Sequence, residues 1–151
     1  DARRGGEPDE AVLRHAQAAE QHFQQALALC PSTAVADLGL MHNQLALLYV
    51  EVGQIELARE HFEKTAQYFE QSGDRYRVGM VRRNMAVMHY DVASREATPA
   101  HRRDLLNRAL AYAQASLRDF QHYQGRAAAN EADAQRLIDA ITQDIGEQRD
   151  M

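Results

Sequence analysis

Residues 42–62 read HNQLALLYVEVGQIELAREHF, and this stretch decides the fold. Two alanines, Ala46 and Ala58, stand among larger apolar residues on either side of Gly53. A glycine between two helical patterns is typical of a short turn, because glycine readily adopts the left-handed backbone that ends a helix. Two helices joined in this way approach closely where small side chains face each other. The stretch therefore predicts an antiparallel helical hairpin with Ala46 and Ala58 at the crossing of its helices.

Length and composition agree with a helical protein. The chain has 151 residues, the size of one domain, and is long enough to bury a sizeable core. Hydrophobic residues make up 45% of it, and only 3 residues are proline. No sustained alternation of β-branched and polar residues marks a strand. We therefore expect an all-α fold.

Charge and cysteine content limit the function classes. The formal net charge is −5, whereas binding of nucleic acid needs clustered basic residues and a positive field. No apolar run approaches the roughly 20 residues that cross a bilayer. Cys30 is the only cysteine, so it has no intramolecular disulfide partner, which fits a reducing compartment. We expect a cytoplasmic protein that contacts neither nucleic acid nor membrane.

Glycine, proline and N-cap residues divide the chain into helices. Six helices are predicted, over residues 9–29, 33–52, 54–71, 75–93, 99–123 and 126–147. Residues 1–8 are predicted to be a disordered or tag-like tail. The glycines that end helices are Gly53, Gly73 and Gly125, and the residues that open them are Pro8 with Asp9, Ser32 or Thr33, Asp74, and Thr98 with Pro99.

Parts of the sequence recur about forty residues apart. Leu45-Ala46 is matched by Met85-Ala86, and Ala19-Glu-Gln-His-Phe23 recurs as Ala58-Arg-Glu-His-Phe62. The repeat predicts one helical domain over residues 9–148, consisting of a half repeat (9–31), a repeat (32–73), an extended repeat (74–125) and a capping helix (126–148). The extended repeat carries about eleven extra residues around Ser94–His101, close to three helical turns. We expect them to lengthen its hairpin at one end.

The repeated pattern resembles the tetratricopeptide repeat, whose signature is W-x2-L-G-x2-Y, then A-x3-F, then P. In this chain the corresponding residues are His42-x2-Leu45-Ala46-x2-Tyr49 and then Ala58-x3-Phe62. Histidine replaces the tryptophan and alanine replaces the glycine. The next repeat departs further, with His89 in place of tyrosine and Ala113 in place of phenylalanine.

This resemblance implies antiparallel helix-turn-helix repeats stacked as a right-handed α-solenoid of about six helices. Repeats of this length are similar to those of bacterial regulators and polarity adaptors. In the family, the first helix of each repeat lines a concave groove that binds a partner. The resemblance places ten residues of this chain in that groove: Leu40, Asn43, Gln44, Leu47, Met80, Arg83, Asn84, Val87, Tyr90 and Asp91.

Two of these groove residues, Gln44 and Asn84, occupy matching places forty residues apart. A side-chain amide offers both a donor and an acceptor, so it can bond both polar groups of one residue in an extended peptide. A ladder of amides would therefore hold a peptide backbone. The alternative is that both amides are simply exposed on a solvated face.

The sequence contains no pattern that indicates catalysis, a cofactor or a metal. His15 and His22 share a helix face but stand two turns, roughly 10 Å, apart, which is too far for one metal ion. The zinc motifs H-E-x-x-H and C-x2-C do not occur, nor does a phosphate-binding glycine loop or the G-x-S-x-G nucleophile motif. We therefore expect no catalytic site, no cofactor and no metal site.

The sequence favours a scaffold or adaptor module that binds a peptide-like segment of a protein partner. Because the chain begins with Asp1, we expect it to be a fragment of a larger bacterial regulatory protein. Two alternatives stay open: a domain that senses a small ligand or peptide, and a structural segment that forms homodimers. The apolar residues of the first helix would need cover from upstream sequence or from a second copy of the chain; they include Leu13, Ala16, Phe23 and Leu27.

Overall fold

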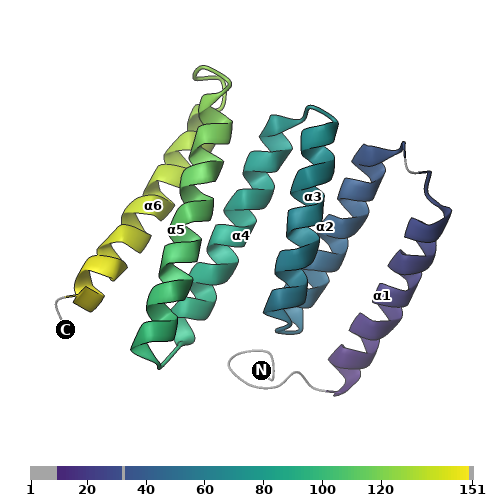
Figure 1. Cartoon of the computed structure of the whole chain (residues 1–151), viewed down its shortest axis with the longest axis horizontal. Helices are drawn as coiled ribbons and strands as arrows, with labels where there is room; N and C mark the ends of the chain where they lie inside the picture. Colours follow the sequence, from purple (N-terminus) through teal and green to yellow (C-terminus); the bar gives the residue numbers. More distant parts are fainter. Residues whose placement is uncertain (1–9, 32, 150–151) are drawn as a thin grey trace. The chain divides into compact units, whose positions relative to one another are not determined.

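A computed structural model of the chain describes residues 10–31 and 33–149. All regular secondary structure in these two ranges is helical, which confirms the predicted all-α fold (Figure 1). The expectations for the tail 1–8, for Pro8 and Asp9 and for Ser32 concern residues outside these ranges. The helices are α1 (Glu10–Leu29), α2 (Val35–Glu51), α3 (Ile55–Gln71), α4 (Arg75–Arg95), α5 (Pro99–Gln121) and α6 (Ala128–Arg149).

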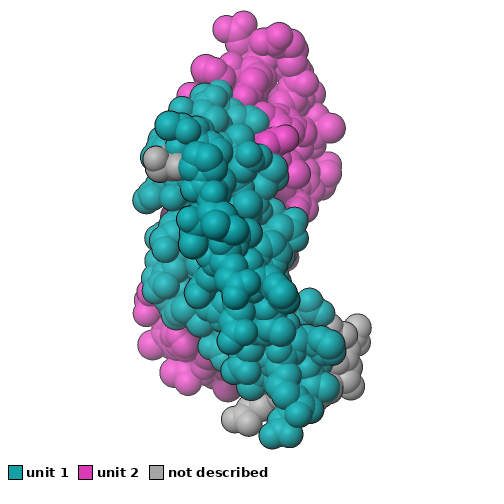
Figure 2. All heavy atoms as spheres, turned by 90° about the vertical axis from the view of Figure 1, so that its right-hand side faces the viewer, with its two compact units in different colours: residues 1–74 teal, residues 75–151 magenta. Residues whose placement is uncertain are grey.

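The helices fall into two compact units, residues 1–74 with α1 to α3 and residues 75–151 with α4 to α6 (Figure 2). The division lies at the turn between α3 and α4, where the sequence places the boundary between its repeat and its extended repeat. The two units are described separately. The single domain over residues 9–148 and the right-handed stack therefore stay predictions.

Glycine ends α2 and α3 by the same device. Gly53 and Gly73 have φ angles of 79° and 75°, in the left-handed region that few other residues adopt. The N–H of Gly53 donates to the carbonyl of Val50, and the next N–H donates to the carbonyl of Tyr49. The same two bonds recur at Gly73, and together they satisfy carbonyl groups that the end of a helix leaves free. Both helix ends lie within one residue of their predicted positions.

Two of the predicted N-caps behave differently from expectation. Helix α2 begins two residues late, with Ala34 instead of Thr33 in the N-cap position. The reason is a turn in which the N–H of Ala34 donates to the carbonyl of Pro31 at 3.0 Å. Thr98 does occupy the N-cap position of α5, with Pro99 in the first turn, but its side chain makes no capping hydrogen bond.

The hairpin of α2 and α3 forms the core of unit 1. Ala46 and Ala58 are fully buried, and the larger side chains of Leu45, Tyr49 and Phe62 are buried with them. Helix packing at small residues, as predicted from residues 42–62, is therefore confirmed. Helix α1 packs more loosely against α2, and Ala16 is its only buried residue in the described part of the chain.

In unit 2, α4 and α5 form a longer hairpin against which α6 packs. Helices α4 and α5 have 21 and 23 residues, whereas α2 and α3 have 17 each. The extra residues thus extend the hairpin by about a turn or more on each helix, as predicted. Its core is formed by small and aliphatic side chains of all three helices, including Ala86, Leu106, Ala109, Ala113 and Ile141.

A buried carboxylate joins the two helices of this hairpin. The Asp119 side chain on α5 is buried and accepts hydrogen bonds from Arg82 at 2.9 and 3.0 Å and from Arg75 at 3.1 Å. Because charged donors bind an otherwise buried carboxylate from two positions along α4, this cluster holds the register between α4 and α5. One turn earlier on α5, the Ser116 hydroxyl donates to the carbonyl of Gly79 at 2.8 Å.

Candidate partner-binding site

The four groove residues predicted in unit 1 lie along one side of α2. Leu40 and Leu47 are 44% and 43% exposed, and Gln44 between them is also exposed. These three residues follow the spacing of one helix face, so we call them the α2 row. Large apolar side chains that are this exposed stand out against the buried residues that alternate with them, Leu45, Ala46 and Tyr49. The α2 row is thus an uncharged, partly apolar surface.

Asn43, the fourth of these residues, is half-buried. Its Oδ1 atom is buried and has no hydrogen-bond partner among the described residues. An unsatisfied buried acceptor costs roughly 1–3 kcal/mol, so such atoms are uncommon in folded proteins. Asn43 therefore adds an acceptor with no partner of its own next to the α2 row.

The groove residues predicted in unit 2 divide into two sets. Val87 is 39% exposed, Asp91 is exposed and Asn84 is half-buried. Asp91 is bound within its own helix, since its carboxylate accepts from Arg95 at 2.7 Å. Gln44 and Asn84 lie in different units, so the amide ladder stays a prediction.

The second set in unit 2 contacts α6. Arg83 forms an ion pair with Asp133, and the Tyr90 hydroxyl donates to Asp144 at 2.6 Å. Met80 accepts a weak hydrogen bond from Asn130 through its sulfur at 3.6 Å. Burial and the neighbouring carboxylate raise the pKa of Tyr90 to about 12. These three side chains therefore hold α4 to α6.

Sequence reasoning missed the partners of these residues on α6. It predicted a capping helix over residues 126–148, but it assigned no contact to Asp133 or Asp144. Their spacing of eleven residues is three helical turns, so both can lie along one side of α6. On α4, Arg83 and Tyr90 are seven residues, about two turns, apart, so the two spacings differ by a turn and gave no clear signal in the sequence.

Two histidines in unit 1 form a cluster that the sequence did not reveal. His42, at the position where the resemblance expects tryptophan, is only 6% exposed, and its Nδ1 lies 2.9 Å from Nδ1 of His61 on α3. Their rings stack on each other, with Tyr68 on His42 and Tyr49 on His61. The hydroxyl of Tyr49 donates to the Glu20 carboxylate of α1, and burial together with this carboxylate raises the pKa of Tyr49.

The cluster is built to stay neutral. One imidazole must donate from Nδ1 and the other must accept, so two neutral rings satisfy each other across the 2.9 Å contact. If both rings were protonated, two N–H groups would face each other. Within residues 10–31 and 33–149, no three histidine, cysteine or acidic side chains gather as metal ligands would.

Helix α1 leaves a crevice against the rest of unit 1. A cavity of about 260 Å³ lies between α1 and residues of α2 and α3, with Leu13, Ala16, Tyr49 and Leu57 in its lining. Of the apolar residues expected to lack cover, Ala16 is buried, whereas Leu13, Phe23 and Leu27 are half-buried. The first helix is therefore incompletely covered within this unit.

No family model, curated protein or solved structure matches the chain. The resemblance to the tetratricopeptide repeat therefore stays a prediction that depends on the residues quoted for it. Among the described residues, no helix is both long enough and apolar enough to span a bilayer.

Proposed function

We propose that the chain is a protein-interaction module, a scaffold or adaptor within a larger bacterial regulatory protein of the cytoplasm. It binds a peptide-like segment of another protein. The observation that carries this proposal is the α2 row, in which Leu40 and Leu47 stay more than two-fifths exposed on either side of Gln44.

The α2 row favours one kind of partner. Leu40 and Leu47 lie two helical turns, about 10 Å, apart, which matches apolar side chains seven residues apart on a helix. Burial of a whole leucine side chain contributes about 1.5–3 kcal/mol, so covering the exposed part of each contributes about 1 kcal/mol. Gln44 supplies a donor and an acceptor between the two leucines. The partner segment is thus an amphipathic helix with a polar residue between two apolar ones.

A peptide-display selection on the immobilised chain tests this proposal. The selected peptides are expected to carry apolar residues seven apart, and their affinity for a Leu40→Ser/Leu47→Ser variant is expected to fall at least tenfold. Leu29→Ser is the matched control, because Leu29 is a highly exposed leucine of α1 outside the α2 row. Both variants change exposed side chains and should keep the helical content and melting temperature of the wild type.

Two results would contradict the proposal. The first is a selection that enriches no peptide above background. The second is a set of peptides whose affinity falls equally in the Leu29→Ser control and in the double variant, since the α2 row would then contribute nothing specific.

A further inference from the structure

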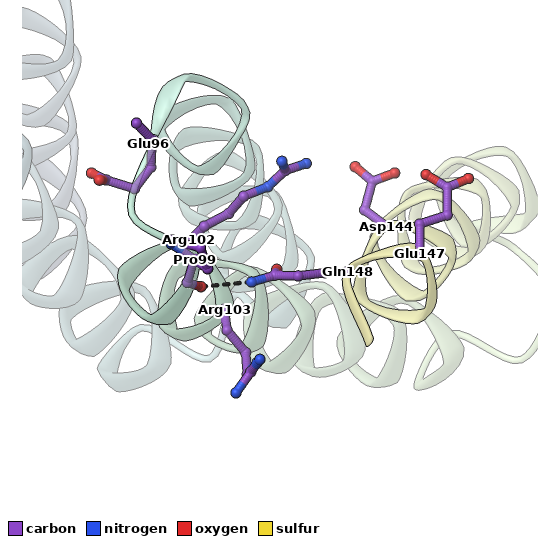
Figure 3. Close-up of a pocket in the computed structure, with 8 residues that line it drawn as sticks. Glu96, Pro99, Arg102, Arg103, Asp144, Glu147 and Gln148 are labelled. Carbon is purple, nitrogen blue, oxygen red and sulfur yellow. Dashed lines mark hydrogen bonds between the residues drawn. The ribbon is translucent and has the colours of Figure 1, made fainter. Parts of the chain in front are cut away.

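A second cavity, of about 520 Å³, lies within unit 2 (Figure 3). It is formed by the loop between α4 and α5, the first turns of α5 and the last turns of α6. Its volume falls in the range of roughly 300–1,000 Å³ that is typical of small-molecule sites. The cavity is separate from the α2 row, which belongs to unit 1.

Arg102 of α5 provides an unused positive charge in this cavity. Its side chain extends between the α4–α5 loop and α6, where Asp144 and Glu147 are located (Figure 3). Within residues 10–31 and 33–149, the Nε atom of Arg102 is buried and has no hydrogen-bond partner. A buried guanidinium donor needs an acceptor, and a planar carboxylate is the acceptor that it fits best. An anionic group of a ligand bound in the cavity would provide this acceptor.

Gln148 of α6 provides an unused acceptor in the same cavity. Its Nε2 donates to the carbonyl of Pro99 at 2.6 Å, and since a carbonyl only accepts, this bond determines which end of the amide is nitrogen. The opposite atom, Oε1, is buried and has no partner among the described residues. A hydrogen-bond donor of the same ligand would satisfy Gln148 Oε1.

The acidic side chains of the cavity are held in place by other contacts. Asp144 accepts from the Tyr90 hydroxyl at 2.6 Å, and Glu147 accepts from Gln143 at 3.1 Å. Glu96 accepts from the N–H of Thr98 at 3.0 Å, and this bond, followed by the nearby His101, lowers the pKa of Glu96. These contacts leave Asp144 and Glu147 each with a carboxylate oxygen that can accept from a ligand.

The charged residues of the cavity determine which class of ligand fits it. Its three carboxylates outnumber the two guanidinium groups of Arg102 and Arg103, so a simple anion meets net negative charge. A simple cation would leave the Arg102 guanidinium without its acceptor. A ligand that carries both a carboxylate and an ammonium group satisfies both needs.

We propose that this cavity binds a free α-amino acid, whose carboxylate pairs with Arg102 and whose ammonium group donates to Gln148 Oε1 and the Asp144 carboxylate. The net negative charge of the lining favours a basic side chain, so L-arginine binds better than L-leucine, and L-glutamate binds worst. This site is independent of the peptide-binding proposal, because it lies in the other unit and uses none of the residues of the α2 row.

Titration calorimetry on the whole chain with three related probes tests the assignment. L-Arginine is expected to bind, whereas agmatine, which lacks the carboxylate, and Nα-acetyl-L-arginine, which lacks the free ammonium group, are expected to bind at least tenfold more weakly. No heat from L-arginine at millimolar concentration would overturn the proposal. Agmatine that binds as tightly as L-arginine would also overturn it, because the site would then recognise a cation alone.

Two arginines of the cavity allow a matched comparison. Arg102→Met is expected to weaken L-arginine binding at least tenfold, whereas Arg103→Met leaves it within about twofold, because Arg103 extends away from Asp144 and Glu147 (Figure 3). Gln148→Met removes the acceptor on α6 and tests the same site if Arg102→Met does not fold. Equal losses in the two arginine variants, or unchanged binding in both Arg102→Met and Gln148→Met, would refute the assignment.

Discussion

Acid is expected to destabilise unit 1 through His42. This side chain is buried between aromatic rings, and its imidazole contacts that of His61. Burial, and then the proximity of His61 and Lys64, lowers the pKa of His42 from 6.5 to about 4. The pKa of His61 is lowered as well, by burial first and then by Lys64. The folded state therefore prefers both rings neutral.

The sign and size of the effect follow from the two protonation equilibria. Between pH 6.5 and about 4, the unfolded chain binds a proton at His42 that the folded chain does not bind. The contribution of neutral His42 to the free energy of unfolding is therefore fully present above pH 6.5. It falls as the pH decreases through this window, by about 1.4 kcal/mol per pH unit. Between pH 7 and pH 5, His42 alone is expected to lower it by about 2 kcal/mol.

Urea unfolding followed by circular dichroism at pH 7 and pH 5 measures this loss. Other groups also titrate, so the comparison is made with His42→Phe, which keeps an aromatic ring in the stack but cannot bind a proton. The loss of stability in the wild type should exceed that in His42→Phe by about 2 kcal/mol. His22→Gln, which changes an exposed histidine on α1, should behave like the wild type.

An equal acid-induced loss in the wild type and in His42→Phe would refute the reasoning, since the buried imidazole would then titrate at its ordinary pKa. The same conclusion would follow if His22→Gln reduced the loss as much as His42→Phe did.

Three further predictions concern packing and ion pairs, and each is measured by chemical unfolding at pH 7. Gly39→Val should lower the free energy of unfolding by about 1–3 kcal/mol, because even a Cβ atom at Gly39 would lie 2.9 Å from the Phe69 ring. Gly146 has open space around it, so the control variant Gly146→Val should change the free energy of unfolding by less than about 1 kcal/mol. Asp119→Asn should cost about 2–3 kcal/mol, because the amide cannot replace the charged acceptor of two arginines; a loss below about 0.5 kcal/mol would contradict this. A double-mutant cycle with Arg83→Met and Asp133→Asn should give a coupling energy of about 0.5–1 kcal/mol, and a value of zero would show that this ion pair does not hold α4 to α6.

Much of the local structure could be predicted from the sequence. Glycines at positions 53 and 73 end helices because they adopt positive φ angles, and both helix ends were placed within one residue. The small residues Ala46 and Ala58 were expected where two helices cross, and both are fully buried. The prediction of Thr33 as an N-cap was wrong, because a turn at Pro31 makes α2 begin later, at Val35. Turn geometry of this kind is weakly encoded by residue type.

The candidate sites were less predictable. The resemblance to the tetratricopeptide repeat implied a groove that includes Leu40 and Leu47; both are exposed, and the groove itself stays a prediction. The roles of Arg83 and Tyr90 did not follow, because their partners Asp133 and Asp144 lie about fifty residues away. The contact between His42 and His61 was also missed, since a histidine is compatible with either a solvated or a buried position.

By itself, the sequence determined the helices, their glycine turns and the small residues at the hairpin crossing, because these depend on backbone preferences and on a 3.6-residue period within one segment. Only the tertiary structure decided which polar groups meet across helices and which stay unpaired. Arg102 and Gln148 show this most clearly, since nothing local distinguishes them from other polar residues of α5 and α6. The physical reason is that such pairings depend on the relative register of distant helices, which residue type and local spacing do not specify.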